Sequence, residues 1–224
     1  MTQKNIYTFP DKDKGNIIIL NIIELENDNS EKIKKIEQLD NKDIVIKNAH
    51  KGNISVLSLN YDGSKLASTS DRGTIVRIFN TQTKSQIGEY RRGNTDANIF
   101  SLSFSYDSSL LGLTSDHGSC HIFSLKISKS NENKDKKKTS SGVMGYLSGS
   151  FSFGVGKKIS NALTVGQEYS WKKFEIPHRE RSFIGFIKDD NNSVYIIDKS
   201  GNYISANLMS EQTPKITKKI NLLV

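Results

Sequence analysis

The sequence lacks the features of several protein classes. It has a single cysteine, Cys120, no apolar run long enough to span a bilayer, and no signal-peptide core near its start. One cysteine excludes an internal disulfide and suits a reducing compartment. The four histidines show no metal-ligand spacing with Cys120, and no catalytic constellation appears. We therefore expect a cytosolic protein that is not an enzyme and that uses no cofactor and no metal.

The charge balance indicates the kind of partner. Lys and Arg number 32 against 24 Asp and Glu, which gives a formal net charge of +8. An excess of positive charge favours an anionic partner such as a membrane surface or a nucleic acid. Aromatic residues are not arrayed on a basic sheet face as RNA binding requires, so we expect no nucleic-acid partner.

A repeat organises the middle of the chain. Residues 60–80 (NYDGSKLASTSDRGTIVRIFN) align with residues 105–125 (SYDSSLLGLTSDHGSCHIFSL), with Asp62 matching Asp107 and Gly73 matching Gly118. Both pairs are 45 apart, since 107−62 = 45 and 118−73 = 45. A period of this length, filled with short apolar strands and Asp-x-Gly turns, is typical of a WD-type β-propeller blade.

Weaker copies flank the two repeats. Residues 182–208 fit three strands of a further blade, with Gly201 at a turn, and residues 15–23 and 43–48 fit strands of a degenerate blade. The charged stretch 24–42 fits a solvated loop better than a short helix around Ile33 and Ile36. The predicted fold is an all-β, WD40-like propeller with about three and a half blades. The expected units are blade fragments in 1–53, a blade in 54–93, a blade in 99–177 with an insertion at 126–169, and a blade in 182–224.

This number of blades is small for a closed ring, because closed propellers have about four to eight. An open arc exposes strand edges, which promotes aggregation. We therefore expect residues 1–224 to be the C-terminal part of a longer propeller or a gene model without its beginning. A four-bladed ring closed by the degenerate first blade is the alternative.

Two adjacent arginines end the strand QIGEYRRG (86–93). Side chains of neighbouring strand residues leave opposite faces, so Arg91 and Arg92 should each serve one of the two spaces between adjacent blades. A guanidinium offers a planar fork that suits phosphate oxygens. Solvated rim charges are the simpler interpretation of the pair.

Hydroxyl residues recur beside each arginine. Ser70 and Thr74 in one repeat match Ser115 and Ser119 in the next at the spacing of 45. Arg77 and His121 break this spacing, since 121−77 = 44, so strand parity puts Thr74 and Arg77 on opposite faces unless a bulge or the turn intervenes.

The arginine pair and the two repeats that flank it together resemble a known family. The stretch YRRG (90–93), between STSDRGTIVRIF and TSDHGSCHIF, resembles the Phe/Leu-Arg-Arg-Gly motif of the PROPPIN family of phosphoinositide-binding β-propellers. Tyr90 stands in place of the usual Phe or Leu. The resemblance covers residues 15–208 and implies seven blades, of which roughly the first three are absent.

The resemblance also implies two headgroup sites, for phosphatidylinositol 3-phosphate and phosphatidylinositol 3,5-bisphosphate. Carried over residue by residue, the first site comprises His50, Ser70, Thr74, Arg77 and Arg91. The second comprises Arg92, Ser115, His117, Ser119 and His121, with His117 in a turn.

A long insertion separates residues 125 and 170, where a turn would suffice. Its first half, 126–142, is rich in lysine, and its second half is apolar and glycine-spaced. Lysines beside exposed aromatics suit an anionic membrane interface, and the resemblance implies a membrane-inserting loop here. Packing of these side chains against the blade is the alternative. The expected membrane loop contains Val143, Met144, Tyr146, Leu147, Phe151 and Phe153.

The sequence therefore predicts a phosphoinositide-binding propeller, cytoplasmic and peripheral on phagophore, endosomal or vacuolar membranes, that recruits an autophagy-type protein partner. The alternative is a generic WD-type scaffold whose arginines contact an acidic peptide. A liposome assay distinguishes the two, because only the first protein responds to phosphoinositides.

Overall fold

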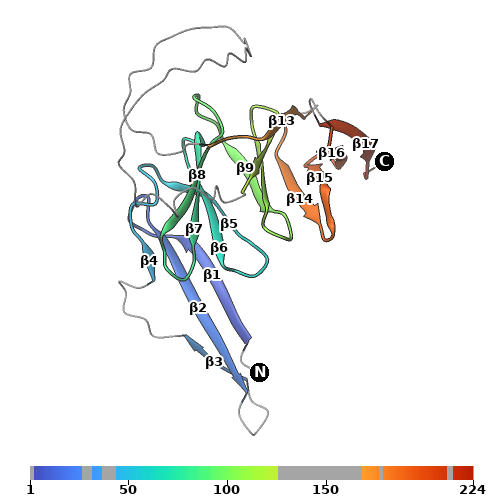
Figure 1. The fold of residues 1–224 in the computed structure, drawn as a ribbon. Coiled ribbons are helices and arrows are strands. Elements are labelled where there is room, and N and C mark those ends of the chain that lie inside the picture. Colours follow the sequence, from blue (N-terminus) through green and yellow to red (C-terminus); the bar gives the residue numbers. More distant parts are fainter. Residues whose placement is uncertain are drawn as a thin grey trace, which may run out of the picture. The chain divides into compact units, whose positions relative to one another are not determined.

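The computed structural model describes residues 3–26, 32–36, 44–125, 168–176, 179–210 and 214–223. Every regular element in these ranges is a β-strand, and the strands form four sheets that follow one another along the chain (Figure 1). In the part of the chain that the structure describes, no helix is long and apolar enough to cross a membrane.

The first sheet is built around its second strand. The strands are β1 (Gln3–Pro10), β2 (Ile17–Glu26), β3 (Lys32–Ile36) and β4 (Val45–Ile46). β1 pairs with β2 along its whole length, while β3 and β4 both pair with β2 at different levels. The expectation of a loop or short helix around Ile33 and Ile36 is wrong. The backbone of β3 pairs with β2, with Ile33 opposite Leu25, because hydrogen bonding to a neighbouring strand overrides the local lysine content.

The second and third sheets contain the two clear repeats. The second comprises β5 (Ile54–Leu59), β6 (Lys65–Ser70), β7 (Ile75–Asn80), β8 (Gln86–Arg91) and a short parallel strand, β12 (Glu168–Tyr169). The third comprises β9 (Ile99–Phe104), β10 (Leu110–Ser115), β11 (Ser119–Ser124) and β13 (Lys172–Glu175). Each sheet is a meander of neighbouring antiparallel strands apart from β12.

The fourth sheet is a regular meander. Its strands are β14 (Ser182–Ile187), β15 (Asp190–Asp198), β16 (Asn202–Asn207) and β17 (Lys215–Asn221).

Apolar clusters lie between successive sheets. Ile17 and Ile19 of the first sheet pack with Leu66 and Phe79 of the second, and corresponding clusters join the second sheet to the third and the third to the fourth. Alternate residues of each strand supply opposite faces, so one strand contributes to two clusters. Each fully buried Leu, Ile or Phe contributes about 1.5–3 kcal/mol, and these clusters hold the sheets in sequence.

The turns between the second and third strands repeat the same clamp in both middle sheets. The backbone and side-chain amides of Asn53 donate to Asp71, and those of Asn98 donate to Asp116, so both members recur at a spacing of 45 (98−53 = 116−71 = 45). Gly73 and Gly118 then turn the chain with φ of 59° and 65°, a conformation that glycine adopts without a side-chain clash. The clamp fixes the ends of the strands on which the candidate site lies.

Candidate functional site

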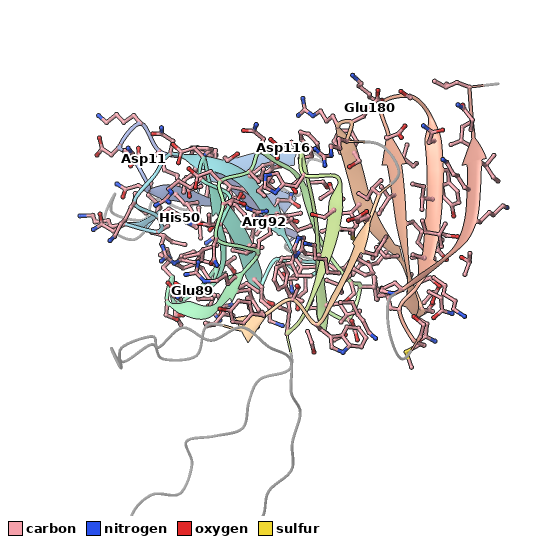
Figure 2. All side chains as sticks on the ribbon, turned by 90° about the horizontal axis from the view of Figure 1, so that it is seen from above. Asp11, His50, Glu89, Arg92, Asp116 and Glu180 are labelled. Carbon is pink, nitrogen blue, oxygen red and sulfur yellow. The ribbon has the colours of Figure 1, made fainter. Side chains whose placement is uncertain are left out.

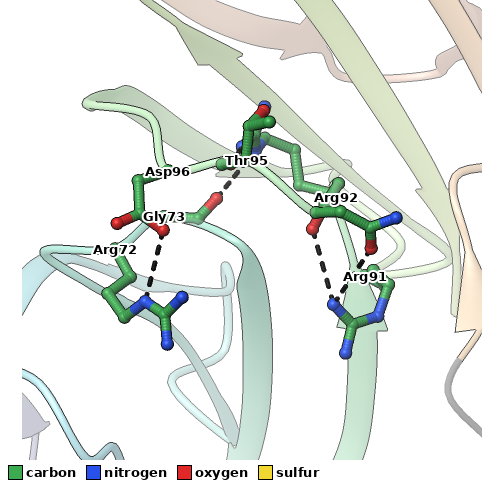
Figure 3. A network of polar contacts seen from close by, with 8 residues as sticks. Arg72, Gly73, Arg91, Arg92, Thr95 and Asp96 are labelled. Carbon is green, nitrogen blue, oxygen red and sulfur yellow. Dashed lines mark hydrogen bonds and ion pairs between the residues drawn. The ribbon is translucent and has the colours of Figure 1, made fainter.

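The two arginines leave β8 toward different neighbours. The ladders pair Ile75 with Arg91 and Arg77 with Glu89, so Arg77, Glu89 and Arg91 share one face of the second sheet. That face meets the first sheet, because Nη1 of Arg77 donates at 2.8 Å to the carbonyl of Ala49, which packs with Ile17 and Ile19 of that sheet. Nη1 of Arg92 instead donates to Nδ1 of His117, in the turn between β10 and β11, at 3.2 Å. Figure 3 shows the two guanidinium groups pointing away from each other.

We call the residues on the face toward the first sheet the first cluster: His50, Ser68, Ser70, Arg77, Glu89 and Arg91. Within it, Nε2 of His50 lies 2.9 Å from the Ser68 hydroxyl, and Nε of Arg77 donates to Glu89 at 2.7 Å. Burial, together with the nearby Arg77, lowers the pKa of His50 to about 4. His50 is therefore neutral at pH 7, and the charges of the first cluster are those of two arginines and one carboxylate. Figure 2 labels His50 and Glu89 of this cluster.

We call the residues between the second and third sheets the second cluster: Arg92, Ser115, His117, Ser119, His121, Lys173, Glu175 and Arg179. Arg92 is buried, with Nε donating to the Gly73 carbonyl at 2.8 Å and Nη2 donating to the Thr95 carbonyl. With the bond to His117, these contacts use three of the five guanidinium N–H groups. Burial lowers the pKa of Arg92 from its ordinary value, and Asp116 and Asp96 oppose this shift. The guanidinium nevertheless stays charged, because arginine does not deprotonate in proteins.

The second cluster surrounds a buried imidazole. The His121 ring lies between two hydroxyls, with Nε2 3.2 Å from Ser119 and Nδ1 3.3 Å from Ser170. Burial first, and then the positive charge of Lys173 and Arg92, lowers the pKa of His121 to about 3. Ser115 is 1% exposed, and its hydroxyl has no hydrogen-bond partner among the described residues.

A pocket opens on the second cluster. Its volume is about 350 Å³, and it is lined by His117, Ser119, Lys173, Glu175 and Arg179. An adjoining pocket of about 390 Å³ shares His117, Glu175 and Arg179 and adds Gly118 and Ile176. Two cationic side chains and a histidine around one carboxylate make a lining that favours an anionic ligand.

The structure explains the spacing of 44 between Arg77 and His121. Thr69 pairs with Val76 and Thr114 with Cys120; the first residues are 45 apart (114−69), but their partners are 44 apart (120−76). The hairpin of the second sheet is therefore one residue longer. By the same shift His121 lies at the level of Arg77, and Ser119 at the level of Ile75.

The prediction that Thr74 and Ser119 are equivalent is therefore wrong. Thr74 is the extra residue in the turn, where its carbonyl accepts hydrogen bonds from the backbone N–H groups of Arg92 at 2.9 Å and Gly93 at 3.4 Å. Ser70 and Ser115 do occupy equivalent positions, opposite Ile54 and Ile99. Of the predicted residues, His50 and Arg77 lie close together at the first cluster. Arg92, His117, Ser119 and His121 lie around the second, where Ser119 bonds His121 and Arg92 bonds His117.

Sequence reasoning missed Glu89 and the residues that follow the insertion. Lys173 and Glu175 lie opposite His121 and Ser119 on β13, and β12 pairs with Tyr90 and Arg91 of β8. Strand parity alone signals that Glu89 and Arg91 share a face, but which residues lie opposite them depends on register. The predicted membrane loop, from Val143 to Phe153, lies outside the described residues, as does His178. Within the described ranges, no group of three or more His, Cys, Asp or Glu residues could hold a metal ion.

Comparison with known proteins identifies the relatives of the chain. A PROPPIN family profile matches residues 29–177, more than half of the chain. Autophagy-related protein 21 of Vanderwaltozyma polyspora is 31% identical over 195 residues, covering 79% of this chain and 46% of that protein. Autophagy-related protein 18 of Scheffersomyces stipitis is 45% identical over 93 residues, covering 42% of this chain and 16% of that protein. The chain thus spans less than half the length of these curated relatives.

Solved structures share the fold. Hsv2 of Kluyveromyces lactis superposes with a TM-score of 0.59 at 16% identity, over 96% of this chain and 73% of that chain. KlAtg21 in its complex with the coiled-coil of AgAtg16 superposes with a TM-score of 0.57 at 20% identity, over 97% of this chain and 58% of that chain. These likenesses, with the four sheets, confirm the predicted all-β, partial-propeller fold class.

Proposed function

The chain belongs to the PROPPIN family, and on that premise we propose that it binds phosphoinositide headgroups through two clusters, one on either side of β8. The observation that carries the proposal is that Arg91 and Arg92 leave opposite faces of the second sheet: Arg91 shares the face of Arg77, and the guanidinium of Arg92 reaches His117. Each arginine is accompanied by a histidine and by serine hydroxyls, which can donate to phosphate oxygens.

The second cluster has the stronger support. Its arginine is held in place by backbone carbonyls, so little side-chain entropy is lost when a ligand binds. The pocket beside it is lined by Lys173, Arg179 and the Ser119 hydroxyl. A phosphate bound there relieves the repulsion between these cations and accepts charge-assisted hydrogen bonds from them, each worth about 1.5–3 kcal/mol.

The proposed ligands are phosphatidylinositol 3-phosphate and phosphatidylinositol 3,5-bisphosphate in cytoplasmic-facing membranes of the phagophore, endosome or vacuole. Binding is peripheral and multivalent: two weak headgroup sites act on one bilayer, and the predicted loop at 143–155 adds an apolar contact. The protein acts as a binding protein that recruits a partner from the autophagy machinery, and it carries out no catalysis itself.

The test is vesicle co-sedimentation of the double variant Arg91→Thr/Arg92→Thr. We expect it to lose phosphoinositide-dependent binding by about a hundredfold or more, because two charge-assisted contacts are removed. Arg181→Thr/Lys199→Thr is the charge-matched control, since both residues are exposed and lie near the fourth sheet. A folded double variant that still sediments with phosphoinositide vesicles like wild type refutes the proposal. Equal binding of the wild type to plain vesicles, with capture of an acidic peptide, identifies the scaffold function instead.

The loop has its own test. Leu147→Ser/Phe151→Ser/Phe153→Ser should weaken vesicle binding and leave binding of the soluble headgroup unchanged, because each buried aromatic contributes about 1.5–3 kcal/mol before ordering costs. Retention of vesicles by this variant at the wild-type level rules out a membrane anchor.

A further inference from the structure

The first cluster contains a carboxylate placed where a bound phosphate could otherwise interact with Arg77. Nε of Arg77 lies 2.7 Å from Oε2 of Glu89, and the two side chains are only 23% and 20% exposed. The ion pair between Arg72 and Asp96, by contrast, is 67% and 64% exposed, where solvent weakens it. Partial burial makes the Arg77–Glu89 pair a persistent feature of the first cluster.

This ion pair limits what Arg77 can offer to a ligand. Its Nε group donates to Glu89 and its Nη1 group to the Ala49 carbonyl, so its fork is engaged from two sides. A phosphate that approaches Arg77 has to displace the carboxylate or lie beside it, and two like charges in a partly buried place repel each other strongly. Arg91 is on the same face of the sheet, with Nη1 3.5 Å from the Gly93 carbonyl and from Oδ1 of Asn94, and in the proposed site it carries the attraction of the first cluster.

The second cluster differs at the equivalent ladder position. Glu89 lies opposite Arg77, whereas Lys173 lies opposite His121, which is at the level of Arg77 in the repeat. A cation thus replaces the carboxylate. The carboxylate of the second cluster, Glu175, lies opposite Ser119 and lines the pocket together with Lys173 and Arg179.

We propose that Glu89 is a specificity-determining residue that makes the first cluster the weaker headgroup site and excludes a second phosphate group from it. This rests on the proposed function of the two clusters. The ligand class of the first cluster is a headgroup that presents one phosphomonoester to Arg91. The second cluster, with Lys173 in place of the carboxylate, accepts the more highly phosphorylated headgroup.

The experiment measures the first cluster alone. Arg92→Thr removes the buried guanidinium of the second cluster and weakens that site, so calorimetric titration with the soluble headgroups of the two lipids then reports mainly binding at the first. Adding Glu89→Gln keeps the shape of the side chain and removes its charge. We expect about five- to tenfold tighter binding, with the larger gain for the headgroup of the bisphosphate. Glu180→Gln, at a carboxylate 4.0 Å from Lys199, is the matched control and should change nothing.

Further variants separate this role from a structural one. A purely structural contribution of Glu89 predicts weaker binding in Glu89→Gln, the opposite sign, and either that result or unchanged affinity overturns the proposal. Adding Arg77→Gln should abolish the gain if Glu89 acts through Arg77. If Arg92→Thr does not fold, Ser119→Ala/Lys173→Ala disables the second cluster instead.

The outcomes also distinguish the two levels of inference. If the wild type binds the headgroups and Glu89→Gln changes nothing, only the proposed role of Glu89 is overturned. If the wild type binds neither headgroup, the proposed function fails and the role of Glu89 fails with it. Repeating the titration with vesicles shows whether the gain applies to the lipid as well as to the free headgroup.

Discussion

The first and second clusters occupy equivalent positions in the strand ladders of their sheets, but they carry different charges. In the first cluster, β8, the strand paired with β7, presents Glu89 and then Arg91; in the second, β13, the strand paired with β11, presents Lys173 and then Glu175. The order of charge along the strand is reversed. A repeat therefore reproduces backbone positions faithfully while leaving each pair of sheets free to acquire its own preference for a ligand.

The largest expected effect comes from exchanging these charges. Glu89→Lys together with Lys173→Glu should invert the ranking of the two clusters, a change of about a hundredfold in the ratio of their affinities. Titration of the exchanged protein in Arg91→Thr and Arg92→Thr backgrounds measures each cluster separately. If the second cluster stays the tighter one, the charges on β8 and β13 do not determine the ranking.

A second comparison uses acid stability, since both clusters bury a neutral histidine. The pKa values of His50 and His121, about 4 and about 3 in the folded chain, lie below the 6.5 of an unfolded histidine. The unfolded chain therefore binds more protons below pH 6.5. Stability is fully present above that value and is lost as the pH falls through the window toward the folded pKa values.

The size of this acid effect can be measured. Each histidine should cost about 2 kcal/mol between pH 7 and pH 5. Urea unfolding of His50→Gln/His121→Gln at the two pH values should show a markedly smaller loss than the wild type. An equal loss in both proteins means that the two imidazoles titrate normally.

The smallest expected effect concerns the unequal hairpins. Deleting Thr74 should leave a turn like that between β10 and β11, where the Gly118 carbonyl accepts from the N–H of Ile176 at 2.8 Å. The Gly73 carbonyl, which already accepts from Nε of Arg92, can then also accept from the backbone N–H of Arg92, so we expect a loss of about 1 kcal/mol, equal to one backbone hydrogen bond. Thermal unfolding measures it. A chain that no longer folds shows that the extra residue is required.

The strands of the two repeats follow from sequence with little ambiguity. Apolar runs, the Asp-x-Gly turns and the spacing of 45 predict β5, β6, β7, β9, β10 and β11, because local turn chemistry and alternation specify them. The opposite directions of Arg91 and Arg92 follow from parity alone. These features depend on residues close together in the chain.

The remainder depends on contacts between distant residues. The level of Arg77 relative to His121 depends on one extra turn residue, which shifts every position after it. The lysine-rich strand β3 forms because β2 supplies a partner, and the two-residue strand β12 has too little sequence to be recognised. For the same reason the residues opposite Glu89 and Lys173 could not be predicted from the composition or from the repeat spacing of 45.

The segment 168–176 links the second sheet to the third and therefore transmits force between them. β12 pairs in parallel with Tyr90 and Arg91, the Ser170 hydroxyl contacts His121, and β13 then pairs with β11. Tension applied to the chain just before residue 168 is therefore borne first by the backbone of the strand that carries Arg91, and only afterwards by the third sheet. Force applied from that side therefore acts on the strand that positions Arg91 before it reaches the third sheet.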